Sequence, residues 1–506
     1  MSTTVTKKTI LMAAVSAMFI FSACHNGGKK DEGGYNATTP TSTCSCETKW
    51  FPHPSTPNTI DGVGGPFDTS STTNCQFHQW SWQKFLWLTR PMQSGHAFFQ
   101  DSLMQVNADL SSVNPYNNIP LVLQDTAQAG SGGSVRTNAT FSTDGQNHLV
   151  YYSIFVDKKL RDAAIAFKAM IVKDPSKLDN DSTFPNGSLE LKISWVNVAA
   201  IPVAEQAAYY TTDAVIKTIV KKDTIYTPTK VALLGMHVVG RVINHPEFIW
   251  ATFEHHHMAA FYNWANATAT SDAAITSTNN KLLFRQGTTT TLAGITWPNN
   301  GTAPDSMYRI FTLYKYGTPR LALDSFMTGT CQAGSVNYAN IDSLNKCVAA
   351  NLAPTDVWRN YFYNGSIWVN MDGTTPAQQA ALLISRGSNI GSALTDSVVR
   401  GSLAVFNLTM ETYLQTFTSN TNQIHTFTAD SIANCFGCHT SAPFSLKFEG
   451  ASYKNKRSPL YVSHIFRDYV SATEKSTLSD AKLQGVKDFL LTRKSIQEKA
   501  LLRKKK

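Results

Sequence analysis

Apolar residues recur at every second position in several stretches in the middle of the chain. In NGSLELKISWVNV, residues 186–198, every second residue from Leu189 to Trp195 is apolar, which predicts a strand with one buried face. TKVALLGMHVVGRVIN, residues 229–244, predicts another strand, and HPEFIWATFEHHH, residues 245–257, continues after a bend marked by its proline. We therefore expect one or more antiparallel sheets in this region.

A helical spacing comes before these strands. In QFHQWSWQKFLWLTRP, residues 76–91, the aromatic and aliphatic residues share a helical face, and Pro91 ends the helix. LTMETYLQ, residues 408–415, predicts a second helix that is followed by a polar loop. The expected fold class is α+β, with a β-rich body containing antiparallel sheet at 50–394 and a C-terminal helical segment with a basic tail at 395–506.

The N-terminal residues predict export. Lys7 and Lys8 precede an apolar run from Ile10 to Phe21, and small residues then lead to Cys24. A charged start, a short apolar run and a small-residue end are typical of a signal peptide, here residues 1–24, because the run is too short to span a membrane comfortably. The ending FSAC resembles the lipobox of bacterial lipoproteins, in which the cysteine becomes acylated.

The residues after the signal refine this localisation. His25 follows the cysteine in place of the Asp that usually marks inner-membrane retention, so we expect an outer membrane lipoprotein that faces the periplasm or the surface. Residues 25–49 are rich in Gly, Thr and charge and predict a flexible tether. Composition agrees, because 42% hydrophobic, 11% aromatic and only 16% charged residues suit an exported, loop-rich globular protein.

The stretch NCFGCHTSAPF, residues 434–444, carries the most specific chemistry. Cys435, Cys438 and His439 form the Cys-x-x-Cys-His pattern of covalent haem c attachment, in which two thiols add to the porphyrin vinyl groups and the next imidazole binds the iron. A thioredoxin-like redox pair would need a preceding strand, and a zinc site would need a second ligand pair nearby; neither is predicted here. We expect one covalent haem.

The sixth iron ligand is open at this level. No methionine follows His439, and the only downstream histidine is His464, a possible distal ligand whose other interpretation is a packing histidine. Met410, His425 or a histidine from the larger body are further candidates. An open coordination position is also compatible with the sequence.

The net charge of +9 is concentrated near the motif. From Lys447 to Lys506 there are fifteen Lys or Arg against six Asp or Glu, an excess that equals the charge of the whole chain. A basic rim beside a haem can steer an acidic redox partner, contact anionic lipid, or be a solvated tail. Nucleic acid is not expected as a partner of an exported protein.

The other cysteines predict disulfides in an oxidising compartment. Cys331 and Cys347 bracket a short polar segment and are the expected local pair. Cys75 is expected to bond Cys44 or Cys46, and the spacing does not choose between them.

A histidine run offers weaker candidates for catalysis. In an extended strand His255 and His257 share a face, and His237 and Glu254 can approach from a neighbouring strand. That set would suit an acid/base pair, a metal site or a distal haem pocket. The other interpretation is a polar loop in which the run is incidental.

Several phrases together resemble a bacterial group labelled cytochrome c family proteins. The phrases are GSLELKISW, GMHVVGRVINHPEFIWATFEH, LTMETYLQ and CFGCHTSAPF, and the resemblance extends from about Gln76 to Arg467. It implies a long β-rich region with one C-terminal, cytochrome c-like haem segment, and it places His237 and His255 at matching positions. EHHHM and VSHIF depart from the group's pattern, so the resemblance does not support His464 as a shared ligand.

These observations predict an exported c-type cytochrome that transfers single electrons through one haem. The alternative is a haem-dependent oxidoreductase, peroxidase-like or oxygenase-like, in which the β-rich body forms a substrate cleft. A third possibility is a binding protein in which the haem is accessory. The sequence leaves open whether the protein is catalytic.

Overall fold

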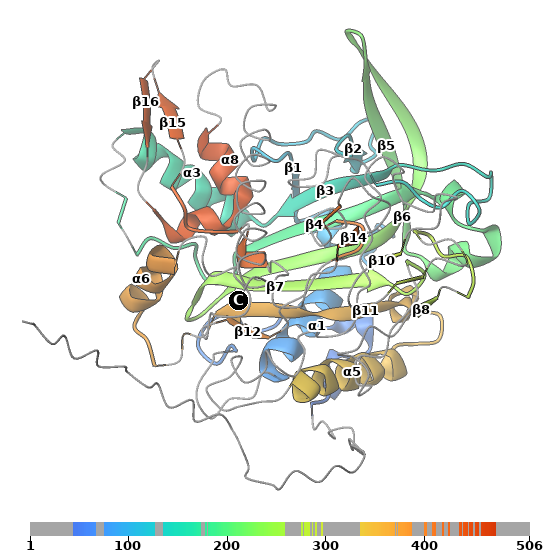
Figure 1. The fold of residues 1–506 in the computed structure, drawn as a ribbon, viewed down its shortest axis with the longest axis horizontal. Coiled ribbons are helices and arrows are strands. Elements are labelled where there is room, and N and C mark those ends of the chain that lie inside the picture. Colours follow the sequence, from blue (N-terminus) through green and yellow to red (C-terminus); the bar gives the residue numbers. More distant parts are fainter. Residues whose placement is uncertain are drawn as a thin grey trace, which may run out of the picture. The chain divides into compact units, whose positions relative to one another are not determined.

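A computed structural model gives the fold of the chain (Figure 1). It separates into a unit Met1–Tyr35 and a unit Asn36–Lys506, and every described residue belongs to the second. The described residues are 44–66, 75–126, 135–173, 178–179, 181–258, 275–276, 278–283, 286, 289–290, 295–296, 334–369, 371, 373–386, 399–401, 407–410, 417–418, 424–425, 435–437, 439–443, 445–448, 451–454 and 457–471.

One large sheet organises the described part of the chain. Its nine strands are β1 (Met104–Val106), β2 (Val122–Leu123), β3 (Val150–Val156), β4 (Leu189–Asn197), β5 (Thr211–Val220), β6 (Asp223–Val242), β7 (His245–His255), β11 (Tyr361–Val369) and β12 (Val399–Gly401). The order is β1-β3-β4-β6-β7-β11-β12, with β5 on the outer part of β6 and β2 beside β5. All pairs are antiparallel except β2 with β5. The expected antiparallel sheet is therefore confirmed.

Smaller strands and short helical turns complete the secondary structure. The small sheets contain β8 (Ile275–Thr276), β9 (Thr289–Thr290), β10 (Ile295–Thr296), β13 (Phe417–Thr418), β14 (Ile424–His425), β15 (Ser445–Phe448) and β16 (Ala451–Lys454). The 3-10 turns are η1 (Thr48–Trp50), η2 (His53–Ser55), η4 (Val198–Ala200), η5 (Val203–Ala208), η7 (Val357–Asn360), η10 (Cys435–Gly437) and η11 (Pro459–Val462).

Helices cover both faces of the large sheet. They are α1 (Cys75–Thr89), α2 (Phe98–Ser102), α3 (Lys158–Lys173), α5 (Gly334–Asn351), α6 (Pro376–Arg386) and α8 (His464–Ser471). α1 and α5 pack with Ile193 and Phe253 in one apolar cluster, whereas α3, α6 and α8 pack with Val239 and Trp250 in another. Figure 1 shows α3, α6 and α8 grouped apart from α1 and α5. No described helix is long and apolar enough to cross a membrane.

The predicted strands and the first helix are confirmed, but two local features differ from expectation. Between β6 and β7 the chain makes a tight hairpin in which Val242 pairs with His245 and Asn244 has a φ of 63°, so the bend comes before the proline. Helix α1 is buried over most of its surface, and even Lys84 on it is fully buried. Its outer side is covered by residues 44–66, which contribute the buried Trp50.

Two disulfides connect the N-terminal residues to the body. Cys44 bonds Cys75, one of the two expected choices, whereas Cys46 bonds Cys347 across 301 residues. The expected Cys331–Cys347 pair is therefore wrong: α5 places Cys347 against the N-terminal segment, and this tertiary approach, not a short loop, selects the partner. Cys331 lies outside the described residues. Residues 44–49, expected in the tether, belong to the body.

The C-terminal segment is joined to the sheet rather than set apart from it. β12 lies beyond the boundary expected near residue 395, yet it pairs with β11 as an edge strand. The helix expected at 408–415 starts as a turn at residues 408–410, and its remainder, like the basic tail after 471, lies outside the described residues. Of the expected helical segment the structure describes α8 and short turns and strands.

Candidate functional site

The Cys-x-x-Cys-His motif begins in a tight turn that is anchored in the core. Cys435 starts η10, and the backbone N–H of His439 donates to the Cys435 carbonyl across 2.9 Å. This bond stacks the histidine one turn above the first cysteine. Phe436 is buried in the apolar cluster that contains Trp250 and thus holds the turn against the sheet. Cys438 lies outside the described residues.

His439 is oriented by a backbone acceptor. Its Nδ1 lies 2.8 Å from the Val462 carbonyl oxygen, which can only accept, so Nδ1 carries the proton. Burial, and next the neighbouring His464, hold the pKa of His439 well below its ordinary value. A neutral Nδ1–H imidazole keeps its lone pair on Nε2, and a metal-bound histidine is usually held in this way.

Two rings enclose the His439 imidazole. The Trp250 indole lies 4.1 Å away between ring centroids, tilted by 44°. His464, the first residue of α8, stacks on the imidazole at 3.9 Å with an interplanar angle of 22°. The two imidazoles thus lie face to face. The assignment of His464 as a distal ligand stays a prediction.

The sheet presents polar groups to this region. We define the motif-side face as the sheet face that carries Trp250, because Trp250 contacts His439. Strand register places His237 on this face, paired with Lys192 on β4 and with Thr252 on β7. Lys192 and, to a smaller extent, His237 contribute electrostatically to lowering the pKa of His439.

Glu190, also on the motif-side face, connects the sheet to the segment that orients His439. Its Oε2 accepts a hydrogen bond from Ser463 Oγ across 2.9 Å, and Ser463 follows Val462 directly. Burial raises the pKa of Glu190 to about 7, against the lowering effects of the Ser463 hydrogen bond and of Lys192. The side chain is 8% exposed. Glu190 and Ser463 were not singled out by sequence, because no spacing links residues 273 apart.

Residues 407–410 pack against the end of the motif-side face that carries Glu254. Asn407 Nδ2 donates to the Phe253 carbonyl at 3.1 Å, and Thr409 Oγ1 lies 2.6 Å from Ser194 Oγ. Gly235 allows this contact, because a Cβ there would lie 2.4 Å from Asn407 Nδ2. Met410, a candidate sixth ligand, is fully buried in the apolar cluster that contains α1. The side chain of His425, another candidate, is outside the described residues.

The three catalytic candidates do not form one group. Glu254 shares the motif-side face with His237, but its Oε1 accepts the backbone N–H of Leu408 at 2.6 Å. His255 points to the opposite face, where it stacks on Tyr209 at 3.6 Å.

Both ring nitrogens of His255 have backbone partners. Its Nδ1 accepts from the His257 N–H at 3.1 Å, and its Nε2 donates to the Ala208 carbonyl at 3.0 Å. The expected extended strand does not reach His257, because β7 ends at His255 and His257 lies in the turn beyond it. The two rings are nevertheless close, with centroids 4.8 Å apart. The hydrogen bonds occupy both nitrogens of His255, which does not favour its use as a metal ligand or a base.

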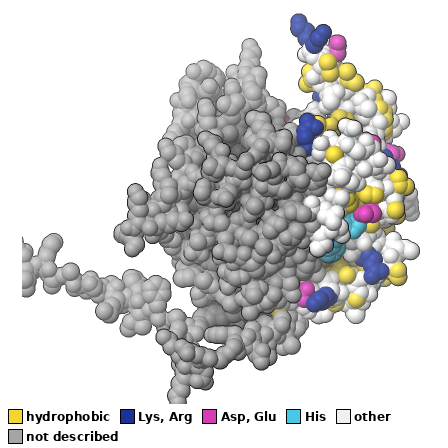
Figure 2. All heavy atoms as spheres, turned by 45° about the vertical axis from the view of Figure 1, so that its right-hand side comes forward, with side chains coloured by type: hydrophobic (Ala, Val, Ile, Leu, Met, Phe, Trp, Pro, Cys, Tyr) yellow, Lys and Arg dark blue, Asp and Glu magenta, His cyan; other side chains and the backbone are white. Residues whose placement is uncertain are grey.

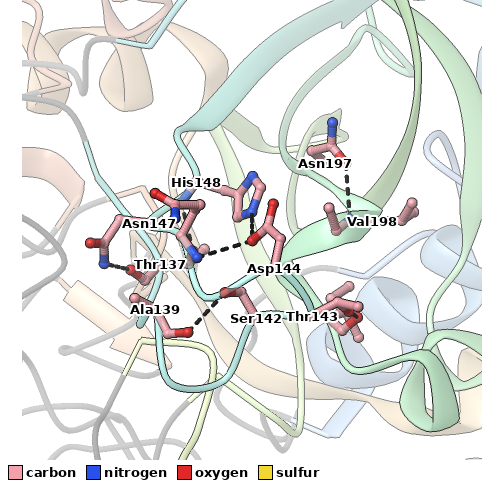
Figure 3. A network of polar contacts seen from close by, with 12 residues as sticks. Thr137, Ala139, Ser142, Thr143, Asp144, Asn147, His148, Asn197 and Val198 are labelled. Atoms are coloured by element: carbon pink, nitrogen blue, oxygen red, sulfur yellow. Dashed lines mark hydrogen bonds and ion pairs between the residues drawn. The ribbon is translucent and has the colours of Figure 1, made fainter.

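A further polar network lies in the loop before β3 (Figure 3). His148 Nε2 pairs with Asp144 Oδ1 at 2.9 Å, and its backbone N–H donates to Thr137 Oγ1 at 2.9 Å. The His148 hydrogen bond is the main cause of the lowered pKa of Asp144. Ser142 and Asn147 bond backbone carbonyls within the same loop. These contacts shape the loop.

The described side chains around the motif have the features that a haem would need. Cys435 and His439 lie on successive turns, Nε2 of His439 carries the lone pair, and an apolar wall of Trp250 and Phe436 stands beside them. These features fit a porphyrin whose iron binds one imidazole. No group of three or more His, Cys, Asp or Glu side chains among the described residues is placed to hold a metal ion, but a haem iron takes four ligands from the porphyrin.

Comparison with family models, with curated proteins and with solved structures found no match to this chain. The motif and the geometry around it are therefore the features that point to a function.

Proposed function

We propose that this chain is an exported c-type cytochrome that binds one haem through Cys435 and Cys438, with His439 as the iron ligand. The observation that carries the proposal is the hydrogen bond from His439 Nδ1 to the Val462 carbonyl, because it fixes the tautomer that an iron-binding imidazole needs. When bound, a haem of this kind supplies single-electron transfer.

Several residues together hold this imidazole in its orientation. Val462 fixes the tautomer, Trp250 limits rotation of the ring, and Ser463 links the Val462 segment to Glu190 on the sheet. Apolar packing around Phe436 excludes water from the start of the motif. Such a shell makes the iron ligand more basic and lowers solvent access, two factors that set a reduction potential.

We propose His237 as the sixth ligand. Strand register puts it on the motif-side face, paired with Thr252, which lies two residues along β7 from the Trp250 that contacts His439. Lys192, its neighbour, directs its ammonium group toward Tyr152, with Nζ 5.5 Å from the ring centroid. An imidazole is also the better iron ligand of the two, since Lys192 would first have to lose a proton.

The second candidate is a haem-dependent oxidoreductase, peroxidase-like or oxygenase-like. The observation in its favour is that His464, the only histidine after the motif, stacks face to face on the His439 ring. Glu190 is then a buried carboxyl near the site with a pKa of about 7, suited to move a proton.

The setting proposed for either function is the bacterial outer membrane. Acylation of Cys24 would anchor the chain, and the basic C-terminal excess would attract an acidic redox partner. Cys24 and most of the basic residues lie outside the described part of the chain.

The proposal is tested by producing the protein in a host that assembles c-type cytochromes. The mature protein should carry the mass of one haem and keep it after acid and organic extraction. A Cys435→Ala/Cys438→Ala variant should lose that mass, whereas Cys331→Ala, the matched cysteine control, should retain it. A colourless wild-type protein without added mass would overturn the proposal.

Optical spectra with cyanide or carbon monoxide separate the two functions. A six-coordinate, low-spin spectrum that ignores both ligands supports the electron carrier. A high-spin spectrum that shifts on ligand addition supports the oxidoreductase and removes the claim that His237 binds the iron.

A further inference from the structure

Strands β5 and β6 continue beyond the large sheet as a two-stranded ribbon. From Lys217 to Tyr226 the two strands pair with each other, and Val220 pairs with Asp223 across a turn of two residues. The turn residues are Lys221 and Lys222, and Lys221 adopts the left-handed conformation, with φ of 57°. Figure 1 shows this ribbon rising from the body.

The end of the ribbon is apolar on both of its faces. Ile219 is 71% exposed, Val220 51% and Ile225 46%. Alternation along the paired strands places Val220 and Ile225 on one face and Ile219 on the other. In Figure 2 hydrophobic spheres lie directly below the Lys, Arg and acidic spheres that cap this projection.

Lysines surround these apolar residues. Lys221 and Lys222 form the apex and Lys217 lies four residues before it, against one acidic residue, Asp223, at the tip. A lysine at the end of an apolar segment can place its ammonium among phosphate groups while its methylene stem stays in the apolar layer. The charge therefore complements an anionic surface.

The root of the ribbon is fixed to the body. Tyr226 stacks on Tyr116 at 4.1 Å between ring centroids, nearly parallel, and Asn197 Nδ2 donates to Thr229 Oγ1 at 2.9 Å. These contacts hold the ribbon outward and keep its apolar end away from the rest of the described chain. An isolated ribbon without such support is only marginally stable in water.

We propose that the ribbon tip, residues 218–225, inserts into the interface of an anionic phospholipid bilayer. A docking groove on a protein covers one face of a ribbon, whereas a bilayer interface surrounds both faces, and here apolar side chains occupy both. Interfacial anchoring elsewhere combines buried apolar area with lysine attraction to acidic lipids in the same way. The insertion depends on neither the haem nor the acylation of Cys24.

The test uses residues 25–506, which contain the whole compact unit and lack the acylated cysteine and the apolar signal run. Binding to phosphatidylglycerol/phosphatidylethanolamine vesicles is measured by co-sedimentation, and amide hydrogen exchange of residues 218–225 is followed with and without vesicles. We expect binding, together with slower exchange at the tip. Vesicles of phosphatidylcholine alone should bind more weakly.

Two variants separate the apolar and the cationic contributions. Ile219→Thr/Val220→Thr/Ile225→Thr keeps the β-branched shape that strands favour, and it should weaken binding by at least about tenfold. Lys221→Asn/Lys222→Gln keeps a residue that tolerates the left-handed turn, and loss of two charges should weaken binding roughly fivefold per lysine at low salt.

The matched control removes exposed apolar residues elsewhere. Ile60, Val63 and Val203 are at least 58% exposed and lie off the ribbon, so Ile60→Thr/Val63→Thr/Val203→Thr should bind as the wild type does. Equal loss in the control, or unchanged exchange at residues 218–225 on vesicles, would overturn the proposal. Binding to detergent-solubilised outer membrane proteins but not to lipid vesicles would also overturn it, because the occupant would then be a protein.

Discussion

The Nδ1 atom of His439 donates a hydrogen bond to the Val462 carbonyl oxygen across 2.8 Å, although 23 residues separate the two in the chain. This contact makes the segment 457–471 part of the candidate haem site, because it decides which nitrogen of the imidazole carries the lone pair. Ser463 then connects that segment to Glu190 in the sheet. The local Cys-x-x-Cys-His motif is thus positioned by residues that are distant in sequence.

The sixth-ligand proposal predicts opposite results for two histidines. His237→Ala should convert a low-spin haem to a high-spin one, because the residue proposed to face the iron is removed. His464→Ala should leave the spin state unchanged, because that ring stacks beside His439. Electron paramagnetic resonance of the oxidised protein distinguishes the spin states. Loss of the low-spin signal in His464→Ala alone would show that the assignment is reversed.

Glu190 predicts a specific pH dependence of stability. Its pKa is about 7 in the folded protein and 4.5 in an unperturbed chain, so between these values the folded state binds more protons than the unfolded state. Its stabilising contribution is therefore complete below pH 4.5 and is lost as the pH rises through 7. The difference between the two pKa values corresponds to roughly 3 kcal/mol, which is an upper limit for this contribution.

Urea unfolding of the wild type and of Glu190→Gln across pH 4 to 8 would measure this contribution of Glu190 to the unfolding free energy. As the pH rises, the unfolding free energy of the wild type should fall relative to that of Glu190→Gln, since Gln carries no charge to bury. Ser463→Ala should destabilise by about 1–3 kcal/mol by removing the donor to Glu190. Ser471→Ala, which affects a hydroxyl bonded to the Arg467 carbonyl on α8, is the matched control and should have less effect. A pH-independent difference would contradict the burial of Glu190.

The disulfide between Cys46 and Cys347 predicts a defined peptide map. Digestion without reductant should release a peptide containing Cys46 linked to one containing Cys347, and no peptide in which Cys331 is linked to Cys347. Replacing both Cys46 and Cys347 by Ala should reduce the unfolding free energy by about 2–5 kcal/mol. Cys331→Ala serves as the control and should leave the Cys46–Cys347 link intact.

The buried pair of Lys84 and Asp61 predicts a non-additive double mutant. Lys84 Nζ lies 2.9 Å from Asp61 Oδ2 and is fully buried, and burial lowers the pKa of Lys84. Asp61→Asn removes the facing charge and should cost about 3–5 kcal/mol, whereas adding Lys84→Met should recover much of that loss.

An exposed pair provides the comparison. Lys346 and Asp342 lie 2.6 Å apart with Lys346 75% exposed, so Asp342→Asn should change the unfolding free energy by less than about 1 kcal/mol. Thermal or urea unfolding measures all of these variants. Additive losses in the double mutant would contradict a coupled pair.

Alternation and helical spacing determined β4, β6, β7 and α1, because these patterns are local and every second or every third to fourth residue faces the core. The Cys-x-x-Cys-His motif likewise lies within five residues, so the expectation of haem comes from sequence alone. The export signal and acylation site are local patterns as well. They stay predictions, since their residues lie outside the described part of the chain.

Only the tertiary structure decided which distant residues meet. Packing of α5 against the N-terminal segment selected Cys46 as the partner of Cys347, and strand register put His237 and Glu254 on one face and His255 on the other. The stacking of His464 on His439 and the bond from Val462 depend on how 457–471 returns to the motif. Such contacts leave no periodic trace in a sequence, because they are set by the direction in which whole elements pack.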